Sequence, residues 1–169
     1  MISVIVCAFN EERYLGSCLD ALVSQDFMAP YEIIIVDDAS NDKTPEISRN
    51  FAERFPNKVR YERILKGGLS KARNTGIGLG KFDVIAFIDG DAIAHPNWLT
   101  EISQSFSDED LTLLGGAIEN LNSDNRLSRF LHDVFYPIPG VHSEPIALRE
   151  VIGTNMAYRK SYFQQYGGF

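Results

Sequence analysis

Residues 84–91 read Val84-Ile85-Ala86-Phe87-Ile88-Asp89-Gly90-Asp91, an apolar run that ends in two carboxylates separated by a glycine. An uncharged run of this length, followed by a turn signal, predicts a strand covered on both faces, as in a parallel sheet. Similar runs occur at residues 2–8 and 32–37, and residues 59–64 alternate in the manner of a further strand. The sequence therefore predicts a sheet whose central strands are fully buried.

Helical patterns lie between these strands. Apolar residues recur at helical spacing in residues 14–22, 44–55, 70–80 and 96–106. In the second of these segments, Thr44 is expected as the N-cap and Pro45 at the first helical position. Strands that alternate with helices form βαβ units, so we expect a three-layer α/β/α fold with a mostly parallel central sheet. Residues 111–118 predict another strand, and residues 120–142 predict an irregular insertion within the same domain.

Length and composition limit the classes of protein that fit. The chain has 169 residues and a mass of 19.0 kDa, which is the size of one domain. Its net charge of −7 argues against a nucleic-acid partner. No apolar run approaches the ~20 residues of a membrane helix, and the N-terminus lacks the basic region and cleavage site of a signal peptide. Cys7 and Cys18 are too few for a disulfide scaffold, so we expect a cytoplasmic location.

The carboxyl ends of parallel strands meet at one edge of the sheet, where α/β proteins bind ligands. Carboxylates gathered there cost free energy unless a cation or hydrogen-bond donors offset them. Oxygen ligands without Cys or His pairs favour Mg²⁺ or Mn²⁺ over zinc. Asp89-Gly90-Asp91 therefore predicts a site for a metal and a diphosphate, and the competing interpretation is a surface turn. The segments expected at this edge are Phe9-Asn10-Glu11-Glu12, Asp37-Asp38-Ala39-Ser40 and Asp89-Gly90-Asp91.

Three other features allow two interpretations each. Asp38 accepts a hydrogen bond either from the N3–H of uracil or from backbone amides of the following helix. Phe9 either stacks on a base or belongs to the core. The stretch 67–76, with Lys71 and Arg73, either supplies positive potential to an anionic ligand or forms a solvated helix face. Neither a dinucleotide-binding pattern nor a P-loop follows the first strand, so those two kinds of nucleotide site are disfavoured.

The segments that carry these features occur in one order along nearly the whole chain. In that order they resemble glycosyltransferase family 2, the inverting nucleotide-sugar transferases with a GT-A fold. Several motifs in a shared order are far more specific than any one of them. The matching segments are residues 4–11 (VIVCAFNE), 35–44 (IVDDASNDKT), 68–76 (GLSKARNTG), 88–91 (IDGD), 153–160 (GTNMAYRK) and 167–169 (GGF).

The resemblance implies roles for individual residues. Asp38 is implied to contact the base, expected to be uracil, and Cys7 and Phe9 to line the base pocket. The sequence at 89–91 matches the DxD motif of the family, with Asp91 as the principal metal ligand and Asp89 reaching the ribose or the metal. Arg73 is implied to lie in the stretch that flanks the donor. The full set of implied donor-binding residues is Cys7, Phe9, Glu11, Asp38, Arg73, Asp89, Gly90 and Asp91.

The resemblance also implies that two parts of the chain have different functions. Residues 1–119 would form the nucleotide-sugar-binding half and residues 120–169 the start of an acceptor-side half. In the family, the Asp or Glu that acts as general base follows the Gly-Gly-Phe motif, whereas this sequence stops at Phe169. We therefore expect a donor-binding portion that ends just before the base. The implied reaction transfers a sugar from a UDP-sugar, or another nucleotide-sugar, to an acceptor hydroxyl with inversion, with Mn²⁺ or Mg²⁺ as cofactor.

Two other functions stay open at this point. The absence of the acid after Phe169 is compatible with a non-catalytic nucleotide-sugar-binding subunit. A Mg²⁺-dependent phosphoryl-transfer domain would use Asp89 as the phosphate acceptor, although such domains place the nucleophile after the first strand, where this chain has Phe9. The expected partners are a nucleotide-sugar donor and a carbohydrate or lipid-linked acceptor. Any association with the inner face of the cell membrane would come from segments outside this chain.

Overall fold

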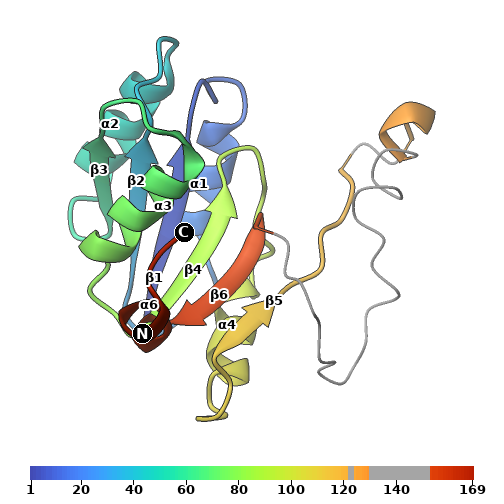
Figure 1. The fold of residues 1–169 in the computed structure, drawn as a ribbon. Helices are drawn as coiled ribbons and strands as arrows, with labels where there is room; N and C mark the ends of the chain where they lie inside the picture. The colour runs from blue at the N-terminus through green and yellow to red at the C-terminus, as the bar shows by residue number, and fades with distance from the viewer. Residues whose placement is uncertain (122–123, 130–152) are drawn as a thin grey trace.

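A six-stranded sheet with the order β3-β2-β1-β4-β6-β5 forms the centre of the protein in a computed structural model (Figure 1). The structure describes residues 1–121, 124–129 and 153–169. Strands β1 to β4 are mutually parallel, whereas β6 runs antiparallel to both of its neighbours, β4 and β5. The sheet is therefore mostly parallel, as predicted. The strand bounds are β1 Ile2–Ala8, β2 Tyr31–Asp37, β3 Val59–Arg63, β4 Val84–Asp89, β5 Leu113–Gly115 and β6 Asn155–Arg159.

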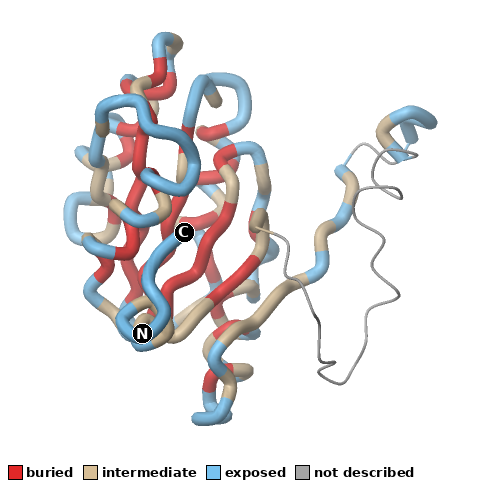
Figure 2. The backbone as a smooth tube through the Cα atoms, in the orientation of Figure 1, coloured by how far each residue is buried: buried red, intermediate tan, exposed pale blue. Residues whose placement is uncertain are grey.

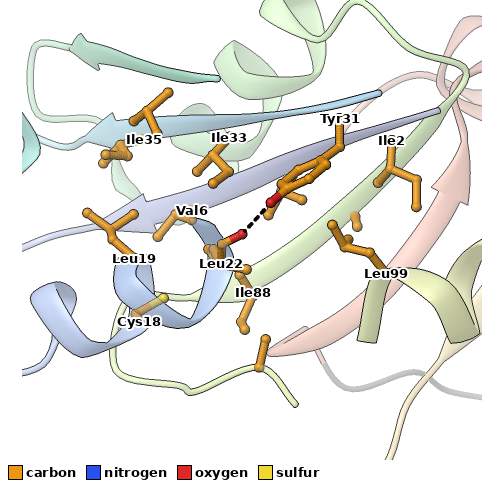
Figure 3. Packing of buried hydrophobic residues seen from close by; sticks show 14 of the residues in the cluster. Ile2, Val6, Cys18, Leu19, Leu22, Tyr31, Ile33, Ile35, Ile88 and Leu99 are labelled. Atoms are coloured by element: carbon orange, nitrogen blue, oxygen red, sulfur yellow. Dashed lines mark hydrogen bonds between the residues drawn. The ribbon is translucent and has the colours of Figure 1, made fainter. Parts of the chain in front are cut away.

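Helices cover both faces of the sheet, and the strands between them are the most buried part of the chain (Figure 2). Alternate residues of β1 show the two layers, because Val6 packs with Leu19 and Leu99 on one face while Ile5 packs with Ala72 on the other. Figure 3 shows the first of these layers, including the hydrogen bond from the Tyr31 hydroxyl to a backbone carbonyl of α1. The predicted three-layer α/β/α architecture is thus confirmed. One face carries α1 (Leu15–Val23), α2 (Thr44–Arg54) and α4 (Trp98–Ser105), and the other carries α3 (Gly68–Leu79) and α6 (Lys160–Tyr166).

Several predicted details differ from the structure. Thr44 is not the N-cap of α2 but its first helical residue; its hydroxyl accepts the Glu11 N–H at 2.7 Å, and its own N–H is bound by the Asp42 side chain. The strand predicted at residues 111–118 is limited to β5, and α3 begins at Gly68 rather than at residue 70. Most of the insertion predicted at residues 120–142 lies outside the described residues. β6 was not predicted from the sequence, and it pairs with β4 from beyond the proposed boundary at residue 119.

A buried carboxylate lies at the amino-terminal end of the sheet, away from the edge predicted to bind ligands. Glu32 in β2 is 3% exposed, and its Oε1 accepts the Ser3 hydroxyl at 2.8 Å and the Lys81 N–H at 2.7 Å. Its Oε2 lies 3.5 Å from the Lys81 ammonium and 3.6 Å from the Arg60 guanidinium. Burial raises the pKa of Glu32, but these hydrogen bonds and cations outweigh that effect and lower the pKa below its usual 4.5. The charged form of Glu32 is therefore favoured by the fold.

We expect Glu32→Gln to destabilise the protein by about 1–2 kcal/mol at neutral pH, because the amide keeps the acceptor for Ser3 but loses the charge. A carboxyl with a lowered pKa in the folded state stabilises the fold above its unfolded pKa and loses that contribution as the pH falls. Urea unfolding at neutral pH and at about pH 3 measures this, and the difference between wild type and variant should shrink at the lower pH. An equal difference at both pH values would contradict the assignment.

Candidate functional site

A cleft of about 460 Å³ opens at the carboxyl ends of β1, β2 and β4. This is the edge at which the sequence predicted a site. Every implied donor-binding residue except Arg73 lines the cleft, although they come from three separate parts of the chain. The lining residues are Cys7, Ala8, Phe9, Glu11, Asp38, Lys66, Gly68, Leu69, Ala72, Asp89, Gly90 and Asp91.

The end of β4 forms an acidic wall of this cleft. The Thr154 hydroxyl, just before β6, donates to Asp89 Oδ2 at 2.7 Å and fixes one carboxylate, whereas Asp91 is exposed. Gly90 lets Glu11 approach, because a Cβ at Gly90 would lie 3.3 Å from Glu11 Cγ. Burial, and then the negative charges of Asp91, Asp42 and Asp89, raise the pKa of Glu11. The wall therefore carries negative charge that nearby cationic side chains do not fully balance.

The chemistry of this wall fits a hard divalent cation. Asp89 and Asp91 offer only oxygen atoms, which Mg²⁺ and Mn²⁺ prefer. No group of three or more His, Cys, Asp or Glu side chains arranged for a metal occurs in the described part of the chain. An ion held here by the two aspartates would complete its coordination with water or with phosphate oxygens, as is common for Mg²⁺. The donor set thus fits an ion that binds together with a phosphorylated ligand.

Asp38 forms the opposite side of the cleft and is nearly buried. Its Oδ1 accepts the Gly67 N–H at 2.7 Å and its Oδ2 accepts the Gly68 N–H at 2.9 Å, so the carboxylate holds the first turn of α3. Gly68 has a φ of 84°, which favours glycine. Each oxygen of a carboxylate has a second lone pair, so Asp38 can still accept a hydrogen bond from a ligand. The alternative predicted from the sequence, bonds to backbone amides of the following helix, is wrong, because Asp38 bonds the start of α3 and not that of α2. The predicted contact with a base stays a prediction.

The loops after β1 and β2 are tied together by hydrogen bonds between side chains and backbone. The Asn10 N–H donates to Ser40 Oγ at 2.9 Å, and the Asn41 N–H returns a bond to Asn10 Oδ1 at 2.9 Å. Both loops contain a non-glycine residue with positive φ, Asn10 at 57° and Ala39 at 62°. Such backbone conformations cost free energy and persist only where surrounding contacts fix them. The bonded pair of loops therefore holds the ends of β1 and β2 in one arrangement. Asp37 takes part in this network and does not line the cleft, because its carboxylate accepts hydrogen bonds from the Ser40 N–H and the Tyr61 hydroxyl.

The floor of the cleft is less polar. Phe9 is 39% exposed, and the Lys66 ammonium lies 3.3 Å from the centre of its ring. Burial, opposed by the charge of Arg73, raises the pKa of the Cys7 thiol to about 12. A thiol with this pKa stays protonated at neutral pH and is a poor nucleophile, which disfavours covalent chemistry at Cys7.

Arg73 is not among the residues that line the cleft. Its guanidinium donates to the Gly153 carbonyl at 3.1 Å and lies 5.0 Å from the centre of the Phe169 ring. The neighbouring Asn74 bonds both the N–H and the carbonyl of Phe169, at 2.9 Å each. Arg73 and Asn74 therefore hold two of the matching segments, 153–160 and 167–169, against α3. The implied role of Arg73 beside the donor stays a prediction.

Sequence reasoning missed two polar residues of the site. Lys66 precedes α3 and has no pattern around it that indicates a ligand, so only the folded chain brings it to Phe9. Thr154 was part of a matching segment but received no role, and its bond to Asp89 depends on the pairing of β6 with β4. Both residues lie just outside a helix or strand, where burial patterns carry little information.

Known proteins share the fold of this chain. The mannosyltransferase PcManGT from Pyrobaculum calidifontis, solved with GDP-Man and Mn²⁺, has a TM-score of 0.78 at 22% identity over 99% of this chain and 47% of its own. S. aureus TarS, solved with UDP-GlcNAc, has a TM-score of 0.74 at 21% identity over 97% of this chain and 46% of its own. These likenesses confirm the expected GT-A fold. The glycosyltransferase AglE of Haloferax volcanii is 31% identical over 99% of this chain.

The chain covers 55% of AglE, so it spans about half the length of the proteins it matches. The family description "Glycosyl transferase family 2" matches residues 3–167, which is nearly the whole chain. That span includes each of the strand ends that build the cleft. On this match the chain belongs to glycosyl transferase family 2.

Proposed function

We propose that this chain is the donor-binding portion of a metal-dependent, inverting nucleotide-sugar glycosyltransferase. The observation that carries the proposal is a cleft that brings together Asp38, Asp89 and Asp91 in a chain of this family. PcManGT and TarS, which share the fold, were solved with GDP-Man and UDP-GlcNAc. A uridine or guanosine diphosphate sugar is therefore the proposed class of donor. Family membership favours this function over phosphoryl transfer to Asp89.

Each wall of the cleft has a proposed role. Asp91 is the principal ligand of Mn²⁺ or Mg²⁺, and Asp89 assists it or binds the ribose, with its orientation fixed by Thr154. Asp38 accepts a hydrogen bond from the base, and the exposed Phe9 ring offers a face for stacking.

The chemistry follows from these roles. When bound, the ion supplies positive charge that stabilises the diphosphate leaving group. The chain fixes the donor from both sides, so that an acceptor hydroxyl can attack the anomeric carbon from the face opposite the leaving group. A general base that deprotonates this hydroxyl contributes about 10²–10⁴ in rate. The placement of that base after Phe169 is a prediction, and so is the division of the chain near residue 119.

Metal dependence of nucleotide binding tests the proposal. We expect UDP or GDP to bind at least about tenfold more tightly with Mn²⁺ or Mg²⁺ than in EDTA, because an ion shared with the diphosphate couples the two binding events. Isothermal titration calorimetry measures both affinities, and uridine without phosphates is the control that should show no metal effect. Failure of both nucleotides to bind, or equal binding in EDTA, would refute the proposed function.

The second substrate of the proposed reaction is the acceptor of the sugar. The proposed acceptor is a carbohydrate or lipid-linked hydroxyl, and much of the predicted acceptor segment lies outside the described residues. Within the described ranges, no helix is both long and apolar enough to cross a bilayer. The expected cytoplasmic location remains a prediction.

Sugar transfer by this chain, tested beside a longer protein that continues past Phe169, would distinguish a portion of an enzyme from a subunit that only binds nucleotide sugar.

A further inference from the structure

Lys66 is the one cationic side chain that lines the cleft in the described part of the chain. It belongs to the connection between β3 and α3, and its ammonium lies 3.3 Å from the centre of the Phe9 ring. The next residue, Gly67, donates its N–H to Asp38 at 2.7 Å. An aromatic face, a hydrogen-bond donor and a hydrogen-bond acceptor therefore meet on one side of the cleft.

Asp38 and Lys66 offer a ligand opposite halves of a hydrogen bond. Both oxygens of Asp38 already accept backbone N–H groups, so a ligand meets only further acceptor lone pairs there. A lysine ammonium has three donors and no acceptor. A planar ligand that stacks on Phe9 must displace the ammonium from the ring face, and the flexible lysine stem lets it move to the edge of that ligand. The edge of the ligand must then present an N–H to Asp38 and an oxygen to Lys66.

This pair of groups matches some nucleobases and not others. Uracil has N3–H beside carbonyl oxygens, and guanine has N1–H beside O6. Cytosine and adenine present the reverse, an unprotonated ring nitrogen beside an amino group, which would leave Asp38 facing an acceptor and Lys66 facing a donor. A site built to hydrogen-bond one pattern rejects the other, because its polar groups are left unpaired.

We infer that Lys66 is a specificity-determining residue, which together with Asp38 selects nucleoside diphosphates whose base carries a ring N–H next to a carbonyl. This inference rests on the proposed function, because it assumes that the cleft binds a nucleotide. It also predicts that the Lys66 charge acts on the base rather than on the phosphates, which are expected at the acidic wall with the metal ion.

The experiment measures the affinities of UDP, GDP, CDP, ADP and pyrophosphate by calorimetry, with Mn²⁺ present throughout. The proteins are wild type, Lys66→Met, which keeps the apolar stem, and Lys66→Arg, which keeps the charge. Lys43→Met is the matched control, because Lys43 is an exposed lysine that does not line the cleft. Circular dichroism and thermal unfolding show that each variant is folded.

Wild type is expected to bind UDP or GDP at least about tenfold more tightly than CDP and ADP, and the stronger of the two identifies the base. Lys66→Met should reduce that ratio about tenfold and leave pyrophosphate binding unchanged. Lys66→Arg and Lys43→Met should keep it. Equal weakening of all five ligands by Lys66→Met would assign the charge to the phosphates and overturn the inference, as would an unchanged ratio or a preference for CDP. If wild type binds none of the nucleotides, the proposed function itself fails.

Discussion

Asp91→Ala is expected to weaken binding of Mn²⁺ together with UDP or GDP by about 100-fold or more. The reason is that the acidic wall offers two aspartates to the ion, and Asp91 is the one exposed at the cleft. Loss of groups that merely support metal ligands costs about 10–100-fold, so loss of a ligand should cost at least as much. Calorimetry with nucleotide, and Mn²⁺ binding followed by electron paramagnetic resonance, measure the two sides of this effect.

Asp20→Ala is the matched control for Asp91→Ala. Asp20 is an exposed aspartate on α1, outside the residues that line the cleft, so its loss changes the net charge equally. The unfolding midpoint of Asp91→Ala should stay close to that of wild type, because an exposed side chain contributes little to packing. Retention of metal-dependent nucleotide binding in Asp91→Ala would show that the cation site lies elsewhere, even if nucleotide still occupies the cleft.

Gly76→Ala is expected to destabilise the fold by about 1–3 kcal/mol, which corresponds to a fall in melting temperature of about 3–10 °C. Gly76 lies in α3 where the helix crosses β1, and a Cβ at this position would overlap Ile5 Cγ2 and lie 2.9 Å from Ile5 Cδ1. Ile5 is fully buried, so either its side chain or the helix must shift. A shift of α3 would also disturb Ala72 and Leu69 on the cleft wall, and nucleotide binding should weaken with stability.

Gly78→Ala provides the opposite expectation within the same helix. Gly78 is exposed, and a Cβ there would meet no atom within 4 Å. Alanine at such a position should stabilise the helix by about 0.5–1 kcal/mol, because glycine loses more conformational entropy on folding. Urea unfolding of both variants compares the signs directly. If the two substitutions change the unfolding free energy alike, close packing of α3 on β1 is not what requires Gly76.

The sequence predicts the central parallel strands β1, β2 and β4 well because they are buried on both faces. β1, β2 and β4 are almost entirely apolar, and no helix of ordinary amphipathic pattern reads that way. β6 escapes the same reasoning, since only Met156 and Ala157 are buried in a strand that also contains Asn155 and Arg159. Its position in the sheet depends on pairing with β4, a long-range contact that local composition does not encode.

The site likewise has features that could be predicted from the sequence and features that could not. The acids at the ends of β2 and β4 could be predicted, because parallel topology alone brings the carboxyl ends of strands together. What could not be predicted is which contacts those acids already make, such as Asp38 with Gly67 and Gly68, or Asp89 with Thr154. The position of Lys66 over Phe9 is likewise a product of the folded connection before α3. Residue type indicated the chemistry of the cleft, and only the structure showed the contacts from which its specificity is inferred.

The bonded loops after β1 and β2 bear on how tightly a nucleotide can bind. Ordering a flexible side chain or loop at an interface opposes association. Here the ends of β1 and β2 are already fixed by the reciprocal bonds of Asn10 with Ser40 and Asn41, so the half of the cleft proposed to hold the base is preorganised before any ligand arrives. The entropic penalty of binding should therefore fall mainly on the exposed lysine stem and on Asp91, and slow steps in donor capture should be sought at those two side chains.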